Sequence, residues 1–218
     1  MKTQKTIKVW DPLVRVFHWS LVLFFVISYA SGEEESLLHP WSGYAIASLL
    51  FVRLVWGFIG TKYARFAGFV YSRTQIISYA KGLISGDAKR YVGHNPLGGL
   101  MIVVLLTSLL MTATTGMLLY GAKESKGPLA GLMAQQSPVQ LPQIISTAHA
   151  DDDEHDHDNA SGKKDDDEHE FLEETHELFA NFTLLLVMLH LAGVFVGSAV
   201  HKESLVKAML SGKKRAKL

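Results

Sequence analysis

The 218-residue sequence contains no cysteine. This absence excludes disulfide bonds, iron–sulfur clusters held by cysteine, and haem attached covalently through a C-x-x-C-H motif. Proline is also scarce, with six residues, and several long stretches carry no charge. Any metal or cofactor must therefore be held by other side chains, and the ten histidines are the main supply of such ligands.

Long apolar runs dominate what is present, and 48% of the residues are hydrophobic. A bilayer core about 30 Å thick needs about 20 apolar residues in helical form. Short connections between such helices favour antiparallel neighbours. We therefore expect one all-α domain, an integral membrane four-helix bundle, with spans at about 13–30, 41–59, 97–119 and 177–200.

The charges are segregated along the chain, although the formal net charge is zero. Most lysines and arginines lie in 2–15, 62–90 and 202–217, whereas most acidic residues lie in 124–177. Because basic loops stay in the cytoplasm, both termini are expected there and the acidic loops outside. A cleaved signal peptide is the alternative for the first span, but cleavage would place the carboxyl tail against this rule.

Histidine inside an apolar span is costly and indicates a function. His190 lies in the middle of the fourth span, and His176 lies 14 residues earlier. On a helix the two share a face within about 40° and are about 21 Å apart along the axis. That separation is too long for one shared metal ion and suits two haems, one near each leaflet.

A second axial ligand for each haem must come from another helix. His18 lies near the cytoplasmic end of the first span and is paired with His190, while His39 begins the second span and is paired with His176. Two histidines leave no open position on the iron, which favours electron transfer. The alternative is that these histidines are interfacial residues or hydrogen-bond between helices.

Several other residues are candidates for contacts with haem. Gly43 lies one turn after His39 and leaves room for a flat macrocycle or for close helix packing. Arg15 and Arg53 are candidates for the haem propionates, or for interfacial residues with the guanidinium at the lipid headgroups. His94 is left open between a loop residue, a propionate contact and part of a quinone pocket. His201, a competitor of His190, is interpreted as the cytoplasmic edge.

The external insertion at 123–170 is acidic and rich in histidine, which predicts disorder. Its bland interpretation is a solvated tether. Two functional hypotheses compete with it: attraction of a basic periplasmic protein by charge, and weak binding of zinc, nickel or copper. The candidate ligands for the metal site are His155, His157 and His169.

In combination, several motifs identify a resemblance to a known family. The sequence resembles the bacterial and nickel-hydrogenase-type cytochrome b561 family over nearly its whole length except the insertion. The residues that carry the resemblance are Trp10-Asp11-Pro12, Arg15-Val16-Phe17-His18-Trp19, His39-Pro40-Trp41-Ser42-Gly43-Tyr44, Arg53-Leu54-Val55-Trp56-Gly57-Phe58, Tyr63-Ala64-Arg65-Phe66, Gly93-His94-Asn95-Pro96, His176-Glu177, His190-Leu191-Ala192-Gly193 and His201-Lys202-Glu203.

The resemblance implies two b-type haems held by His18, His39, His176 and His190, in the inner membrane of a bacterium. It also implies electron transfer between quinone and a periplasmic partner, such as a c-type cytochrome or a hydrogenase-like oxidoreductase. The acidic loop would be periplasmic. The other expected partners are membrane lipid and, in a possible homodimer, a second copy of the chain. No nucleic-acid partner is expected. The alternative functions are a divalent-metal transporter or sensor that uses the histidine-rich loop, and a passive membrane anchor of a larger oxidoreductase.

Overall fold

The computed structural model describes residues 6–32, 36–131 and 159–216 of the chain. Its main elements are four long helices, each long and apolar enough to cross a membrane. They are α1 (Pro12–Ala30), α2 (Leu38–Ile59), α4 (Pro96–Glu124) and α6 (Asn159–Val200). The expected all-α membrane bundle is thus confirmed.

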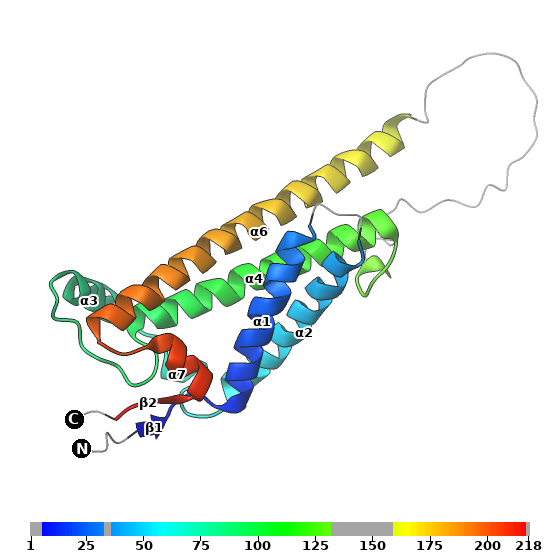
Figure 1. Cartoon of the computed structure of the whole chain (residues 1–218). Coiled ribbons are helices and arrows are strands. Elements are labelled where there is room, and N and C mark those ends of the chain that lie inside the picture. Colours follow the sequence, from blue (N-terminus) through cyan, green and yellow to red (C-terminus); the bar gives the residue numbers. More distant parts are fainter. Residues whose placement is uncertain (1–5, 33–35, 132–158, 217–218) are drawn as a thin grey trace, which may run out of the picture.

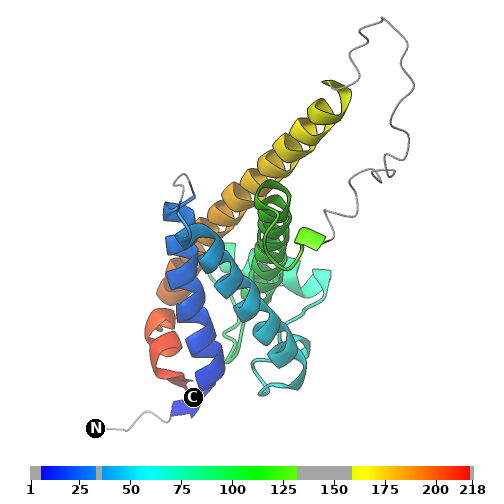
Figure 2. The same cartoon turned by 90° about the vertical axis from the view of Figure 1, so that its right-hand side faces the viewer.

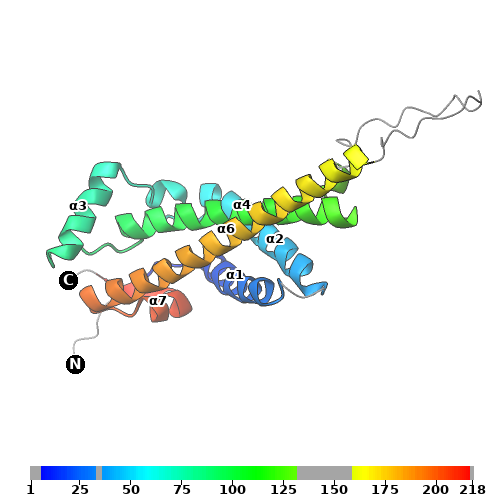
Figure 3. The same ribbon diagram turned by 90° about the horizontal axis from the view of Figure 1, so that it is seen from above.

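The four long helices form two pairs. Helix α4 runs along α6, α1 packs on α2, and α2 joins the pairs through α4. Figures 1 and 3 show α4 and α6 side by side over most of their length. Figure 2 shows α1 and α2 separating toward the end of the bundle that carries the chain termini. This spread leaves the lower ends of the helices apart from one another.

The apolar core is small, as expected for helices that face lipid. Ile46 and Leu50 of α2 pack on Leu109 of α4, and partly buried side chains of α1 cover them. Large apolar side chains instead point outward, including Phe58 (74% exposed) and Phe195 (71% exposed). Water would penalise such a surface, whereas a bilayer accommodates it.

Short elements close one end of the bundle. Helix α3 (Arg73–Ile84) lies beyond the start of α4, after the 3₁₀ turn η1 (Phe66–Gly68). Helix α7 (Leu205–Ser211) follows α6 and leads into β2 (Lys213–Arg215). Strand β2 pairs antiparallel with β1 (Thr6–Lys8), so the first and last described segments are hydrogen-bonded neighbours (Figure 1). The sequence analysis did not predict this two-stranded sheet.

The helix bounds differ from the expected spans mainly in α6. This helix begins at Asn159, well before the expected start at 177, so part of the expected insertion is helical. The other three helices begin within three residues of the expected positions, and α4 continues to Glu124. Of the candidate loop ligands, His155 and His157 lie outside the described residues. His169 lies within α6, and no group of three metal-ligating side chains occurs in the described part of the chain.

Candidate haem sites

Local capping fixes where α1 and α4 begin. The Asp11 carboxylate accepts a hydrogen bond from Val14 N at 2.9 Å, and Pro12 occupies the first turn. Asn95 and Pro96 repeat this arrangement at the start of α4. Side-chain caps of this type satisfy free N–H groups at a helix start. The cap on α1 sets the register that brings His18 to the second turn of the helix.

The pair nearer the chain termini consists of His18 and His190, and it is called the inner pair below. It joins α1 to α6. The ring centres of His18 and His190 are 6.5 Å apart, with an angle of 55° between the ring planes. A bond between a metal and an imidazole nitrogen is about 2 Å long, so two imidazoles on one metal ion have centres roughly 6 Å apart. Both side chains are half-buried. The spacing therefore fits two axial ligands of one iron.

The outer pair joins α2 to α6 in the same way. His39 and His176 have ring centres 5.9 Å apart, with perpendicular ring planes. The structure thus brings together both pairs that the sequence suggested. Because His176 and His190 both belong to α6, one helix supplies a ligand to each pair.

Hydrogen bonds orient both outer histidines. His39 Nδ1 donates to Ser28 O at 2.8 Å, and His176 Nδ1 donates to Thr112 O at 3.0 Å. Thr115 Oγ1 lies 3.2 Å from the same His176 nitrogen. A carbonyl can only accept, so each Nδ1 carries the proton and each Nε2 keeps a free lone pair. This is the tautomer that a metal requires, held by the kind of support usual around metal ligands.

A glycine makes room for His176. A Cβ atom added at Gly116 of α4 would lie 2.7 Å from His176 Cε1 and 3.1 Å from its Nδ1. Any larger residue would therefore push the imidazole away from the Thr112 carbonyl. The sequence analysis missed Gly116, because glycine in an apolar span equally indicates simple helix packing.

Space beside the pairs is consistent with a flat cofactor. Helix α6 packs closely on α4, whereas its approach to α1 and α2 depends largely on the histidine side chains. An added Cβ atom at the half-buried Gly43 would meet no atom within 4 Å. The His18 Nδ1 atom is inaccessible to solvent and has no partner. These features fit a macrocycle between the histidines better than they fit a closed protein core.

Both arginines that the sequence singled out, Arg15 and Arg53, lie at the end of the bundle that carries the chain termini. Each has an N–H group without a hydrogen-bond partner among the described residues. Arg53 is 3% exposed and donates through Nη2 to Ala64 O at 3.1 Å, but its buried Nη1 has no partner. Arg15 donates to Leu210 O, and its Nε is buried without a partner. Arginine pairs well with carboxylates. Both side chains therefore remain candidates for haem propionates.

The two histidines with open roles differ in their surroundings. His94 packs against Trp10 and Phe69, with ring centres 4.4 and 4.9 Å away, and its buried Nδ1 has no partner. Burial, with the nearby charges of Lys214 and Arg53, lowers the pKa of His94 to about 3. It is therefore a neutral imidazole at neutral pH.

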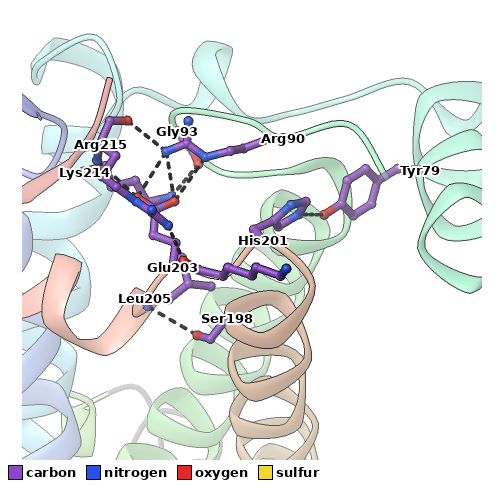
Figure 4. Close-up of polar contacts among 10 residues, drawn as sticks. Tyr79, Arg90, Gly93, Ser198, His201, Glu203, Leu205, Lys214 and Arg215 are labelled. Carbon is purple, nitrogen blue, oxygen red and sulfur yellow. Dashed lines mark hydrogen bonds and ion pairs between the residues drawn. The ribbon is translucent and has the colours of Figure 1, made fainter. Parts of the chain in front are cut away.

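His201 instead follows the last residue of α6, and its Nε2 lies 3.1 Å from the Tyr79 hydroxyl of α3 (Figure 4). Burial lowers its pKa, with contributions from the charges of Arg90 and Lys214. It pairs with no other histidine among the contacts of the described residues. His201 therefore holds α3 to α6 and is not a second ligand at the inner pair.

Comparison with known proteins places the chain in a family. The family model for prokaryotic cytochrome b561 matches residues 9–212, which is nearly the whole chain. No curated protein and no solved structure gives a significant match. The matched region contains all four helices and both histidine pairs. The chain therefore belongs to the prokaryotic cytochrome b561 family, as a multi-pass membrane electron-transfer cytochrome with haem b as its cofactor.

Proposed function

We propose that the chain carries electrons across the bacterial inner membrane between quinone and a periplasmic redox partner. Two b-type haems would serve as carriers, the inner one held by His18 and His190 and the outer one by His39 and His176. The observation that carries the proposal is the pair of histidine contacts, each with the spacing of two ligands on one metal ion. Haem supplies one-electron redox chemistry when bound.

The protein side of this function is orientation and enclosure. Histidines on both sides of an iron leave no open coordination position, which favours electron transfer over oxygen binding. The hydrogen bonds to Ser28 O and Thr112 O keep the outer ligands in the metal-binding tautomer. Lipid-facing side chains on the helices exclude water from both sites.

Charge supports the expected orientation and the type of partner. Arg53, Lys214 and Arg90 lie at the end that carries the termini, whereas exposed Glu173 and Glu177 lie near His176 on α6. Basic segments favour the cytoplasmic side. An acidic outer end would attract a basic periplasmic protein, such as a c-type cytochrome, by electrostatic steering.

Spectra of the purified chain and of single variants test the haem assignment. The reduced protein should show a b-type α-band with two haems per chain. His190→Ala should lose the inner haem alone, and His176→Ala the outer haem alone, because each removes one axial ligand. His201→Ala is the matched control, since its ring contacts Tyr79, and it should retain both haems.

Absence of the α-band in the wild-type protein would overturn the proposal, and retention of both haems in both ligand variants would overturn the pairing. Deletion of residues 149–170 separates the electron-transfer function from a metal transporter or sensor. Haem content and quinone reduction should survive the deletion under the proposal, whereas metal-dependent activity would be lost under the alternative.

A further inference from the structure

Lys214 is a buried lysine with few polar partners in the described part of the chain. It occupies the middle of β2, where it is 6% exposed, while its neighbour Lys213 is exposed. Among the described residues, the Lys214 ammonium donates only to Gly93 O, at the long distance of 3.5 Å (Figure 4). An ammonium has three protons to donate, and burying it unpaired is costly. Burial and the charge of Arg90 lower the pKa of Lys214, although Glu203 opposes this.

The acidic group near Lys214 is already engaged. Glu203 accepts hydrogen bonds from Arg90 at 3.1 to 3.3 Å and from Arg215 N at 3.3 Å (Figure 4). No carboxylate in the described part of the chain comes within 4.0 Å of Lys214 Nζ. The ammonium therefore has no direct ion pair in this part of the chain, and Glu203, whose charge acts on it from beyond 4.0 Å, already pairs with Arg90.

Lys214 belongs to a group of donors beside the inner histidine pair. Its Nζ lies 5.7 Å from the centre of the Trp10 ring, and that ring packs on His94. The nearby groups Lys214, Arg53 and His190 each contribute to the lowered pKa of His94. Arg53 contributes its unpartnered Nη1 and His94 its unpartnered Nδ1. The Lys214 ammonium and the Arg53 guanidinium thus keep protons to donate in one buried place around His94, whose pKa also responds to the proposed haem ligand His190.

We propose that Lys214, with Arg53 and His94, forms a carboxylate-binding site for the propionates of the inner haem. This inference rests on the proposed function, because it requires a haem between His18 and His190. A carboxylate matches the donors: the guanidinium offers a fork to two oxygens, and the ammonium supplies a point charge. Inorganic phosphate or a lipid phosphate shares this anionic chemistry, and the test must separate these sources.

The β1–β2 pair acquires a role under this proposal. Alternation along β2 turns Lys213 outward and Lys214 inward, and the antiparallel partner Ile7 of β1 fixes that register. A one-residue slip would exchange the two lysines. The pairing of the chain ends therefore selects which lysine faces the haem site.

The site is tested by a double-mutant-type cycle in which residue 214 and the charge of the haem propionates are changed singly and together. The full-length chain is reconstituted with haem b or with its dimethyl ester, whose propionates carry no charge, and the rate of haem loss from the inner site is measured. Lys214→Met should speed loss of haem b by roughly ten- to a hundredfold, as expected when a charged hydrogen bond is removed. It should change loss of the ester little. Lys213→Met is the matched control and should behave as wild type.

Three outcomes decide the matter. Equal effects of Lys214→Met on haem b and on its ester would overturn the inference in favour of a phosphate or a purely structural lysine. The proposed function would survive that result, since haem would still be bound. Lys214→Arg keeps the positive charge and should lose haem b as slowly as the wild-type protein. That result supports the inference and excludes misfolding as the cause of the faster loss in Lys214→Met. Absence of any haem that depends on His18 and His190 would overturn both proposals.

Discussion

Asp11 links the start of one membrane helix to the end of another. Besides capping α1, its carboxylate accepts hydrogen bonds from Trp56 Nε1 at 3.1 Å and from Thr61 Oγ1 at 2.6 Å. Burial alone would raise the pKa of Asp11, but the hydrogen bonds from Thr61, Val14 and Trp56 outweigh it and lower the pKa below 3.8. The ionised carboxylate therefore stabilises the inner end of the bundle.

Asp11→Ala should destabilise the chain by about 1–3 kcal/mol, because it removes a helix cap and leaves the part-buried Trp56 indole and Thr61 hydroxyl without their acceptor. Thermal unfolding in detergent, followed by helical circular dichroism, measures the loss. The exposed Asp87→Ala serves as the control and should change little. Since the folded pKa is depressed, this stabilisation is present above pH 3.8 and is lost as the pH falls further. An Asp11→Ala chain as stable as wild type would contradict this account.

Gly116 should prove selective for the outer haem. Gly116→Val would place carbon atoms against the His176 ring, which lies 2.7 Å from an added Cβ, and would displace the ligand. We expect loss of the outer haem with the inner haem retained, measured by haem content and the reduced spectrum. Gly131→Ala, where an added Cβ meets nothing within 4 Å, is the control. Equal loss of both haems would indicate general misfolding instead.

At the scale of elements, polar side chains join α4 to α6. Thr183 of α6 is fully buried, and its hydroxyl lies 2.6 Å from Ser108 Oγ and 3.2 Å from Thr112 Oγ1 of α4. Thr112 in turn precedes Thr115, which contacts His176. Hydrogen bonds between helices fix their relative register within an apolar environment. This contact therefore helps to hold α6, and with it both α6 ligands, against α4.

A double-mutant cycle of Thr183→Val and Ser108→Ala measures this contact. We expect a coupling free energy of about 0.5–1.7 kcal/mol, the range found for hydrogen bonds between membrane helices. Unfolding of the two single variants and the double variant in detergent supplies the value. The pair Thr183→Val and Thr107→Ala is the control, because Thr107 bonds to its own helix. Strict additivity in the first pair would show that the hydroxyl contact contributes nothing.

The long helices could be predicted from the sequence, whereas the short elements could not. A run of about 20 apolar residues is a local signal, and so is the spacing of His176 and His190 along one helix. The β1–β2 pair consists of three-residue strands that lie about 200 residues apart in the sequence. No local pattern in the sequence predicts such pairing. Lys214 was hidden for the same reason, since in the sequence it is one of several lysines in a basic tail. Gly116 and the Thr112 carbonyl depend on helix–helix packing, which spacing within one helix does not reveal.

At the scale of the whole molecule, the two termini lie at one end of the bundle. Strand pairing holds residues 6–8 beside residues 213–215 (Figure 1). An even number of spans requires the termini to share a side of the membrane. The charge rule then selects the cytoplasm for that side.

Cysteine labelling tests this orientation, and the absence of native cysteine makes the test clean. Lys126→Cys and Lys213→Cys each introduce one thiol at an exposed position on opposite ends. A membrane-impermeant maleimide applied to spheroplasts should label the first and not the second, because basic segments remain inside. Permeabilised cells, in which both should react, provide the control. The reverse pattern would place the acidic end in the cytoplasm.

The pairing of β1 with β2 also sets an order of events during biosynthesis. Strand β1 is synthesised about 200 residues before β2, so it cannot pair until residues 213–215 have been made. Until then neither Lys214 nor its register is in place, although the helices that carry His18 and His190 have already been made. This end of the bundle therefore stays open until residues 213–215 have been made and can pair with residues 6–8.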